Sequence, residues 1–335
     1  MSAPSSDRER PQPTGVPALE ARGVAVSFRG RGSGGTARAV DGVDLVLGHG
    51  EIVALVGESG CGKTTLARTL LGLEHPTSGQ VLVDGVPLSY TGRSLKAYRR
   101  RVQLVLQDPT GALNPRHTVY EAVAEGLRVH GITDGERERV SAALARAGLR
   151  PPERFFLRYP HELSGGQRQR VVIAGALVLE PAVIIADEPV SSLDASVRGE
   201  ILALLLRLRD ELRLSLLVVT HDLGLAWNIA DRVAVMYLGR IVEQGPTEEL
   251  LADPKHPYTR ALLSVVPEME RLEQTVLLGE PPDPTRMPSG CNFHTRCPKA
   301  VERCAAEQPV MRELAPHHIA ACHFPEGRHA TTGLA

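Results

Sequence analysis

Hydrophobic and polar positions alternate along the first part of the chain in the manner of β-strands. The stretches are LEARGVAVSF (19–28), AVDGVDLVL (39–47) and EIVALVG (51–57). A glycine-rich segment, RGRGSGGTAR (29–38), separates the first two and predicts a mobile hairpin turn. The third stretch is a continuous apolar run that ends in glycine, which is typical of a buried strand leading into a loop.

From about residue 108 to 180 the apolar spacing becomes helical. One apolar face consists of Val119, Ala122, Val123 and Leu127, and a second of Val140, Ala143, Leu144 and Ala147. Gly148 is placed to end the second helix. A third, largely apolar helix is expected from Gly166 to Glu180, where Pro181 stops it.

Strands and helices alternate again after this helical region. AVIIAD (182–187) and SLLVVTHD (215–222) have the character of buried strands, and an amphipathic helix over 197–212 lies between them. VAVMYLGRIVEQG (233–245) indicates a hairpin that closes the core. Alternating strands and helices predict a parallel α/β core, on which 108–180 is a helical insertion.

Length and composition narrow the class of protein. The 335 residues suggest about two domains, and 42% hydrophobic residues suffice for a packed core. The net charge of -1 gives no electrostatic footprint for DNA or RNA, so we expect no nucleic-acid partner. The sequence has neither an apolar run of about 18–20 residues nor a signal peptide, which favours the cytoplasm. We expect a disordered lead-in (1–17), a main domain (18–250) and a C-terminal extension (251–335).

The segment GESGCGKT (57–64) matches the phosphate-loop pattern G-x-x-x-x-G-K-[ST], placed between a predicted strand and a helix. Glycines let consecutive backbone N–H groups face phosphate oxygens, and the helix N-terminus adds positive potential. Lys63 can reach the β- and γ-phosphates, and the Thr64 hydroxyl can bind Mg²⁺. At the end of the strand AVIIAD, Asp187 can hold Mg²⁺ through water and Glu188 can activate the attacking water.

A second glycine-rich turn, LSGGQ (163–167), opens a predicted helix. Ser164, Gly165 and Gly166 offer N–H groups and a hydroxyl to a phosphate. One bound nucleotide does not require two such turns from one chain. The second turn is therefore expected to contact a nucleotide held by a partner chain.

GESGCGKTT, Gln107 in LVLQDP, LSGGQ, IIADEP followed by SSLD, and His221 in VVTHD occur in an order that resembles ATP-binding cassette (ABC) ATPases. The resemblance implies a P-loop NTPase (RecA-like) core with an antiparallel β subdomain and a helical insertion. It implies ATP hydrolysis with Mg²⁺, held through Thr64, Gln107 and Asp187, and a catalytic role for Lys63, Gln107, Glu188 and His221. The implied ATP-binding residues are Phe28, stacked on adenine, with Gly57, Ser59, Gly60, Cys61, Gly62, Lys63, Thr64 and Thr65. The implied contacts to the partner's nucleotide are Ser164, Gly165, Gly166, Gln167 and Asp194.

Within this family, QDPTGALNPRHTV, HPYTRALLSVVP and the PSGC-x₅-C ending resemble the ATPase subunits of dipeptide, oligopeptide and nickel importers. Two membrane permeases and a second ATPase subunit, a paralogue or the same chain, are the implied partners, with an extracytoplasmic solute-binding protein acting indirectly. The expected location is the cytoplasmic face of the cell membrane. Peptides are the favoured cargo and nickel or another small solute the alternative; a soluble, non-transport ABC ATPase is the third interpretation.

Four cysteines, Cys291, Cys297, Cys304 and Cys322, cluster in the proline-rich C-terminal region. Clustered thiols in a cytosolic chain suggest a metal centre rather than disulfides. Their wide spacing suits a 4Fe–4S cluster at least as well as zinc, and the family resemblance also points to 4Fe–4S. Zinc, or buried cysteines without metal, are the alternatives. The nearby histidines that could replace a cysteine ligand are His294, His317, His318 and His323.

Overall fold

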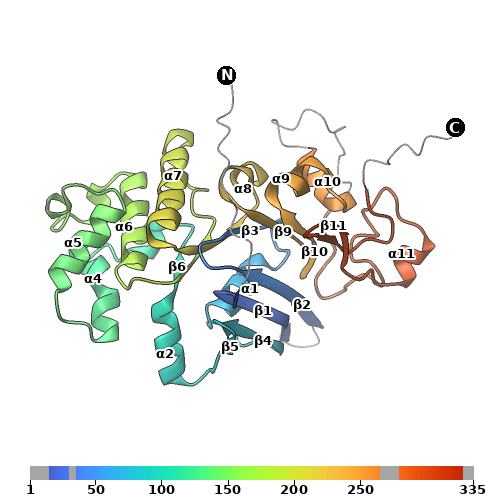
Figure 1. Cartoon of the computed structure of the whole chain (residues 1–335), viewed down its shortest axis with the longest axis horizontal. Coiled ribbons are helices and arrows are strands. Elements are labelled where there is room, and N and C mark those ends of the chain that lie inside the picture. Colours follow the sequence, from blue (N-terminus) through green and yellow to red (C-terminus); the bar gives the residue numbers. More distant parts are fainter. Residues whose placement is uncertain (1–14, 30–34, 265–278, 327–335) are drawn as a thin grey trace.

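A computed structural model describes residues 15–29, 35–264 and 279–326 of the chain (Figure 1). Most of the predicted lead-in and the middle of the predicted glycine-rich turn lie outside these residues. Within them, the strands form two sheets, one of eight strands and one of four.

The larger sheet has a parallel centre in the order β9-β3-β8-β7-β6. These strands are β3 (Ile52–Val56), β6 (Val102–Val105), β7 (Val183–Asp187), β8 (Ser215–Thr220) and β9 (Arg232–Tyr237). Every residue of β3 and β8 is buried, as their continuous apolar runs predict for strands covered on both faces. The helices α1 (Lys63–Leu70), α7 (Ala195–Leu212) and α8 (Leu223–Ile229) connect or flank them. The predicted parallel α/β core is present.

The smaller sheet is antiparallel in the order β2-β1-β4-β5 (Figure 1). Its strands are β1 (Leu19–Arg29), β2 (Thr36–Leu47), β4 (Ser78–Val83) and β5 (Val86–Pro87). The two sheets share a core with α1, in which alternate residues of β1 and β2 pack against Leu66 and Leu70. This sheet is the predicted antiparallel β subdomain, and it positions β2 beside the phosphate loop.

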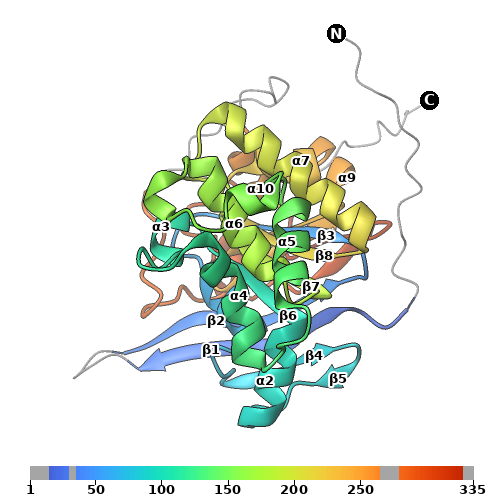
Figure 2. The ribbon, with the colours of Figure 1, turned by 90° about the vertical axis from the view of Figure 1, so that its left-hand side faces the viewer.

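A group of helices forms the end of the molecule that faces the viewer in Figure 2. They are α3 (Pro109–Ala112), α4 (Val119–His130), α5 (Glu136–Arg146) and α6 (Gly165–Leu177), with 3-10 turns at Pro152–Arg154 and Pro160–Glu162. α2 (Gly92–Arg101) lies apart from them, beside the smaller sheet, and its Tyr98 joins the core shared with α1. Thr118 begins α4 with a capping box to Glu121, and Gly131, at φ 71°, ends it. α6 ends three residues before the predicted Glu180, which has φ 52° and precedes Pro181.

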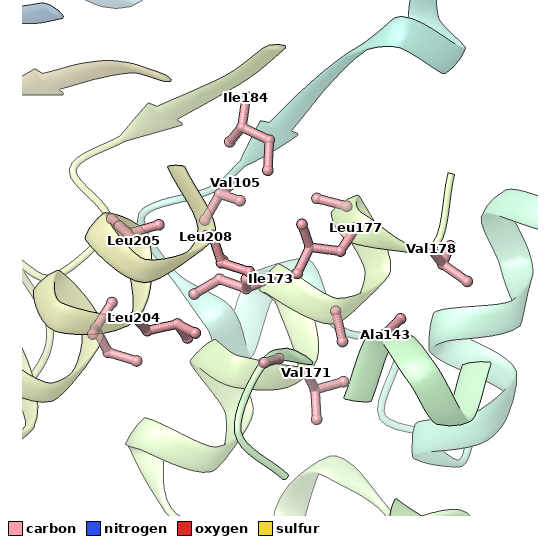
Figure 3. Packing of buried hydrophobic residues seen from close by; sticks show 14 of the residues in the cluster. Val105, Ala143, Val171, Ile173, Leu177, Val178, Ile184, Leu204, Leu205 and Leu208 are labelled. Atoms are coloured by element: carbon pink, nitrogen blue, oxygen red, sulfur yellow. The ribbon is translucent and has the colours of Figure 1, made fainter. Parts of the chain in front are cut away.

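The predicted apolar helix faces meet in one core between this helical region and the parallel sheet. Ile173 of α6, Leu204 and Leu208 of α7, and Ile184 of β7 are among its members (Figure 3). All four side chains are essentially inaccessible to solvent. Burial on this scale, at about 25 cal/mol per Å² of apolar surface, anchors the helical region to the sheet.

The C-terminal region contributes to the larger sheet. β10 (Arg240–Pro246) pairs with β9, and β12 (His318–Ala320) and β11 (Arg312–Ala315) continue the sheet beyond it. Three short helices, α9 (Thr247–Ala252), α10 (Pro257–Leu263) and α11 (Glu302–Ala306), complete this end. The predicted hairpin over 233–245 is present, but the sheet does not end at it.

Candidate nucleotide-binding site

The phosphate loop follows β3 and leads directly into α1. A Cβ atom at Gly57 would lie 2.2 Å from the carbonyl oxygen of Met236, and one at Gly62 would lie 2.0 Å from that of Ala39. Neither position can hold a side chain without moving β9 or β2. Gly60, at φ 77°, adopts a left-handed conformation that favours glycine. The loop is therefore wound tightly, which aims its backbone N–H groups at one point.

Lys63 is the first residue of α1, and its side chain turns back into the loop. Its Nζ donates hydrogen bonds to the carbonyl oxygens of Gly57, at 2.7 Å, and Glu58, at 2.9 Å. Cys61 lies 3.8 Å from the same Nζ, and burial raises the pKa of its thiol. Burial and a raised pKa disfavour the reactive thiolate form. They therefore do not favour covalent chemistry at Cys61.

Two acidic residues lie at the end of β7 beside this loop: Asp187 is the last residue of the strand and Glu188 follows it. Burial raises the pKa of Asp187, and a hydrogen bond with Thr64 acts in the opposite direction. Glu188 has φ 48°, a left-handed conformation that costs a non-glycine residue about 1–3 kcal/mol. Its backbone N–H donates to the carbonyl of Val219 at 2.8 Å, which holds this conformation in place.

Glu188 is the centre of a side-chain network. His221 Nδ1 lies 2.7 Å from Glu188 Oε1, and Gln107 Nε2 donates to Glu188 Oε2 at 3.2 Å. Gln107 follows β6, Glu188 follows β7 and His221 follows β8, so three adjacent parallel strands deliver them to one edge of the sheet. A carboxylate held in this way can accept a proton from water and pass it towards the histidine.

These residues surround one cavity of about 740 Å³, a volume suited to a nucleotide. Its walls come from the phosphate loop, β2, the β9–β10 turn and the C-terminal region. The lining residues are Ala37, Arg38, Ala39, Gly57–Thr65, Gln107, Asp187, Glu188, His221, Leu238, Gly239, Leu262 and Pro284. The structure thus brings together every predicted catalytic, Mg²⁺ and phosphate-loop residue.

Phe28 is the one predicted ATP-binding residue outside this lining. It lies on β1 opposite Ala37 of β2, and 43% of its surface is exposed. Ala37 does line the cavity, so Phe28 lies one strand away from it. Adenine stacking by Phe28 stays a prediction.

The predicted partner contacts also lie outside the cavity. Ser164 begins α6 with a reciprocal capping box: its hydroxyl accepts from the N–H of Gln167, and the Gln167 side chain accepts from the N–H of Ser164. Ser164 is exposed, as is Asp194 at the start of α7. A Cβ at Gly166 would lie 2.7 Å from Val197, so the turn packs closely on α7. The turn is preformed, lies outside the chain's own cavity and exposes its cap Ser164, so it can meet another molecule.

Several lining residues carry no sequence motif. Glu58 occupies a variable position of the phosphate-loop pattern, and Arg38, Leu238, Leu262 and Pro284 reach the cavity from distant segments. The sequence offers a signal only for Glu58, because it is an acidic residue inside a loop that is expected to bind phosphates. The others could be found only once the strands were placed.

The four late cysteines line one small cavity of about 20 Å³, together with Phe293 and Phe324. Burial raises the pKa values of Cys291, Cys297 and Cys322, the last to about 11. Within the described residues, however, no three His, Cys, Asp or Glu side chains are arranged so that they could hold a metal ion. The cysteines converge, but not at ligand spacing.

The predicted substitute histidines have other contacts. His294 Nδ1 lies 2.9 Å from the Cys291 carbonyl, and His323 Nε2 lies 3.0 Å from that of Glu307. His318 Nε2 lies 2.6 Å from Glu243, and both side chains are buried. His317 is exposed.

Comparison with known proteins gives a consistent result. Residues 40–191 match the family model described as ABC transporter. Residues 242–304 match the model described as the C-terminal region of oligopeptide/dipeptide transporters. A peptide import ATP-binding protein of Brucella ovis is 47% identical over 315 residues, covering 92% of this chain and 98% of that protein. The chain belongs to the ATP-binding subunits of ABC transporters.

One further relative and one solved structure support membership of this family. The oligopeptide transport ATP-binding protein AppF of Bacillus subtilis is 47% identical over 299 residues, which is 87% of this chain and 90% of AppF. The ATP-binding cassette MJ0796, solved as a dimer in a post-hydrolysis state with ADP and phosphate, is 31% identical with a TM-score of 0.60. That match covers 68% of this chain and 98% of the cassette. The predicted family, its fold class and its ATPase activity are confirmed.

Among the described residues, no helix has the length and apolar character needed to cross a lipid bilayer.

Proposed function

We propose that this chain is the energy-coupling ATPase subunit of an importer for peptides. ATP would bind in the 740 Å³ cavity, with its phosphates against the loop Gly57–Thr65. Mg²⁺ would be held by the oxygen-bearing side chains of Thr64, Gln107 and Asp187, which suit a hard cation. When bound, Mg²⁺ neutralises charge on the phosphates.

Hydrolysis is assigned to the network around Glu188. Glu188 orients and deprotonates the attacking water, and His221 and Gln107 hold its carboxylate in place. Lys63 stabilises the negative charge that develops on the phosphates. The single observation that carries this assignment is the convergence of these groups on the lining of one cavity.

The exposed turn Ser164–Gly166, with Gln167 and Asp194, supports a second step of the proposal. We assign this turn to the phosphates of a nucleotide bound by a second ATPase subunit, either a paralogue or another copy of the chain. ATP then lies between two subunits and closes the pair, and hydrolysis releases it. The dimeric arrangement of the similar cassette MJ0796 supports this arrangement.

The names of the similar proteins support peptides as cargo. An ATP-binding subunit of an importer acts on membrane permeases, and two permeases are the proposed partners. We place the chain at the cytoplasmic face of the membrane, with the solute-binding protein acting through the permeases. The direct test is co-purification with the permeases encoded beside its gene, followed by ATPase measurement in vesicles. Peptide-loaded binding protein should stimulate ATP hydrolysis, and Lys63→Ala should abolish ATP hydrolysis. Stimulation by nickel-loaded binding protein alone would reassign the cargo, and failure to bind any permease would contradict the transport role.

We also retain the 4Fe–4S cluster at Cys291, Cys297, Cys304 and Cys322 as a proposal. Their convergence on one cavity supports it, although the thiols must move to reach ligand spacing. Anaerobically purified protein should contain iron and absorb broadly near about 400 nm. Absence of both would contradict the proposal.

A further inference from the structure

The C-terminal region reaches the phosphate loop through one ion pair. Arg296 Nη1 donates to Glu58 Oε2 at 2.7 Å, and Arg296 Nη2 donates to Glu58 Oε1 at 3.1 Å. The two residues are 238 positions apart in the sequence. The arginine side chain is 5% exposed and the carboxylate 25%, so the pair is largely shielded from water. A bidentate, partly buried pair of this kind is stronger and more directional than an ordinary surface ion pair.

The backbone of Glu58 is held from the same side. Its N–H donates to the hydroxyl of Tyr258, on α10, at 2.9 Å. Tyr258 is fully buried. Glu58 is therefore fixed at both backbone and side chain by residues that follow position 250.

An aromatic cluster holds the arginine-bearing loop against the parallel sheet. Phe293 packs against both Tyr237 of β9 and Tyr258 of α10, with ring centroids 5.2 and 5.4 Å away, and those two rings lie 4.7 Å from each other. The Arg296 guanidinium lies 6.0 Å from the centre of the Tyr237 ring. The Asn292 side chain donates to the carbonyl of Leu238, a residue that lines the nucleotide cavity. The loop between Cys291 and Cys297 is therefore packed against β9, α10 and the β9–β10 turn.

Glu58 occupies a sensitive position. Its carbonyl oxygen and that of Gly57 accept the hydrogen bonds from Lys63. Its carboxylate places a negative charge in the phosphate loop, and this loop would face the phosphates of ATP. An uncompensated carboxylate there would repel them through a medium of low dielectric constant. Arg296 both neutralises this charge and orients it.

We propose that Arg296 is a positioning residue for nucleotide binding: by neutralising and fixing Glu58, the loop between Cys291 and Cys297 sets the affinity of the phosphate loop for ATP. This inference rests on the proposed function in one respect, that the 740 Å³ cavity binds ATP. Arg296 itself does not line that cavity and acts only through Glu58.

Steady-state ATPase kinetics of charge variants test the proposal in the full-length chain. Arg296→Gln should raise KM for ATP about tenfold and leave kcat within about twofold, since one charge-assisted interaction corresponds to roughly that factor. Adding Glu58→Gln to this variant removes the exposed charge and should restore most of the affinity. Arg296→Lys keeps the charge but not the bidentate geometry, and should raise KM about threefold.

Arg303→Gln is the matched control. Arg303 directly precedes Cys304, as Arg296 directly precedes Cys297, and it pairs with Glu307 at 2.9 Å on the exposed surface. This control should retain the unmodified KM. A KM unchanged in Arg296→Gln, even with a lowered melting temperature, would reduce the pair to a structural contact and overturn the proposal. So would a double variant no better than Arg296→Gln.

If Arg296→Gln does not fold, Arg296→Lys decides: an unchanged KM in that variant overturns the proposal. Lys63→Ala, measured alongside, separates the two levels of inference. If the unmodified chain binds ATP and Lys63→Ala does not, the proposed function stands whatever the Arg296 variants do. Absence of ATP binding by the unmodified chain would overturn both.

Discussion

Two regions of the molecule are held in place by different forces. The part of the chain up to β10, called the cassette below, is built around large apolar cores in which strands such as β3 and β8 are wholly buried. The C-terminal segment 279–326 buries few apolar side chains, mainly Phe293, Cys304, Ala320 and Ala321. The cassette is stabilised by burial of apolar surface. The segment is held by the packing of Phe293 on Tyr237 and Tyr258 and by specific polar contacts with the cassette.

One of these polar contacts joins His318 of the segment to the buried residue Glu243 of β10. Its carboxylate accepts hydrogen bonds from the backbone N–H groups of Lys255, at 2.6 Å, and His256, at 2.9 Å, and lies 2.6 Å from His318 Nε2. The three partners come from the turn before α10 and from β12. The contrast between the regions therefore predicts that cassette substitutions can remove catalysis without loss of stability, whereas substitutions at this contact reduce stability.

The largest effect is expected inside the cassette. Glu188→Gln should lower kcat by about a hundredfold or more, because the amide cannot deprotonate water, while ATP still binds. ATPase assays and thermal unfolding should be measured together, and the melting temperature should stay unchanged. Glu211→Gln, an exposed acid on α7, is the control and should match the unmodified chain. Hydrolysis retained in Glu188→Gln would make the catalytic assignment wrong.

At the Glu243 contact, protonation of His256 should make the free energy of unfolding depend on pH. Burial lowers the pKa of His256 to about 4. As the pH falls, the unfolded chain binds a proton on this histidine near pH 6.5, whereas the folded state binds one only near pH 4. The contribution of neutral His256 to stability is therefore complete above pH 6.5 and is lost as the pH falls towards about 4. The loss amounts to up to about 3 kcal/mol.

Urea unfolding at a series of pH values measures this dependence. His256 Nδ1 accepts from the N–H of Tyr258 as the cap of α10, and asparagine can supply a similar acceptor. His256→Asn should therefore flatten the dependence between pH 6.5 and 4 without loss of the helix. An unchanged pH profile in this variant would show that another group is responsible.

A smaller effect is expected from His318→Ala. This change leaves Glu243 buried with its two backbone donors only, which should cost about 2 kcal/mol of unfolding free energy. His317→Asn is the matched control: His317 is exposed, has φ 59°, and asparagine tolerates that conformation. Equal stability of the two variants would contradict the importance of the Glu243 contact.

The same contrast explains what the sequence could predict. The parallel core and its helices follow from apolar periodicity, and the phosphate loop, Glu188 and His221 lie in motifs at strand ends. The short exposed strand β5 and the strongly basic helix α2 gave no periodic signal. β11 and β12 lie in a region rich in cysteine and proline, where pairing depends on β10 rather than on local pattern.

Long-range polar contacts could not be predicted from the sequence, for a physical reason. Nothing in the residues around Arg296 specifies Glu58 as its partner, because that pairing is fixed by aromatic packing of Tyr237, Tyr258 and Phe293. For the four late cysteines, the sequence predicted the common location but not the spacing between the thiols. Their sequence clustering correctly indicated a common location, but ligand spacing depends on side-chain positions that no spacing pattern encodes.

The central claim is that one chain holds only part of a catalytic site and that ATP joins it to a second cassette. The most direct measurement is the mass in solution of Glu188→Gln with ATP and Mg²⁺, alone and with the second ATPase subunit of its transporter. We predict a particle with two cassettes in ATP and separate chains in ADP. Adding Ser164→Arg should prevent pairing while ATP stays bound. A single cassette saturated with ATP under both conditions would contradict the account.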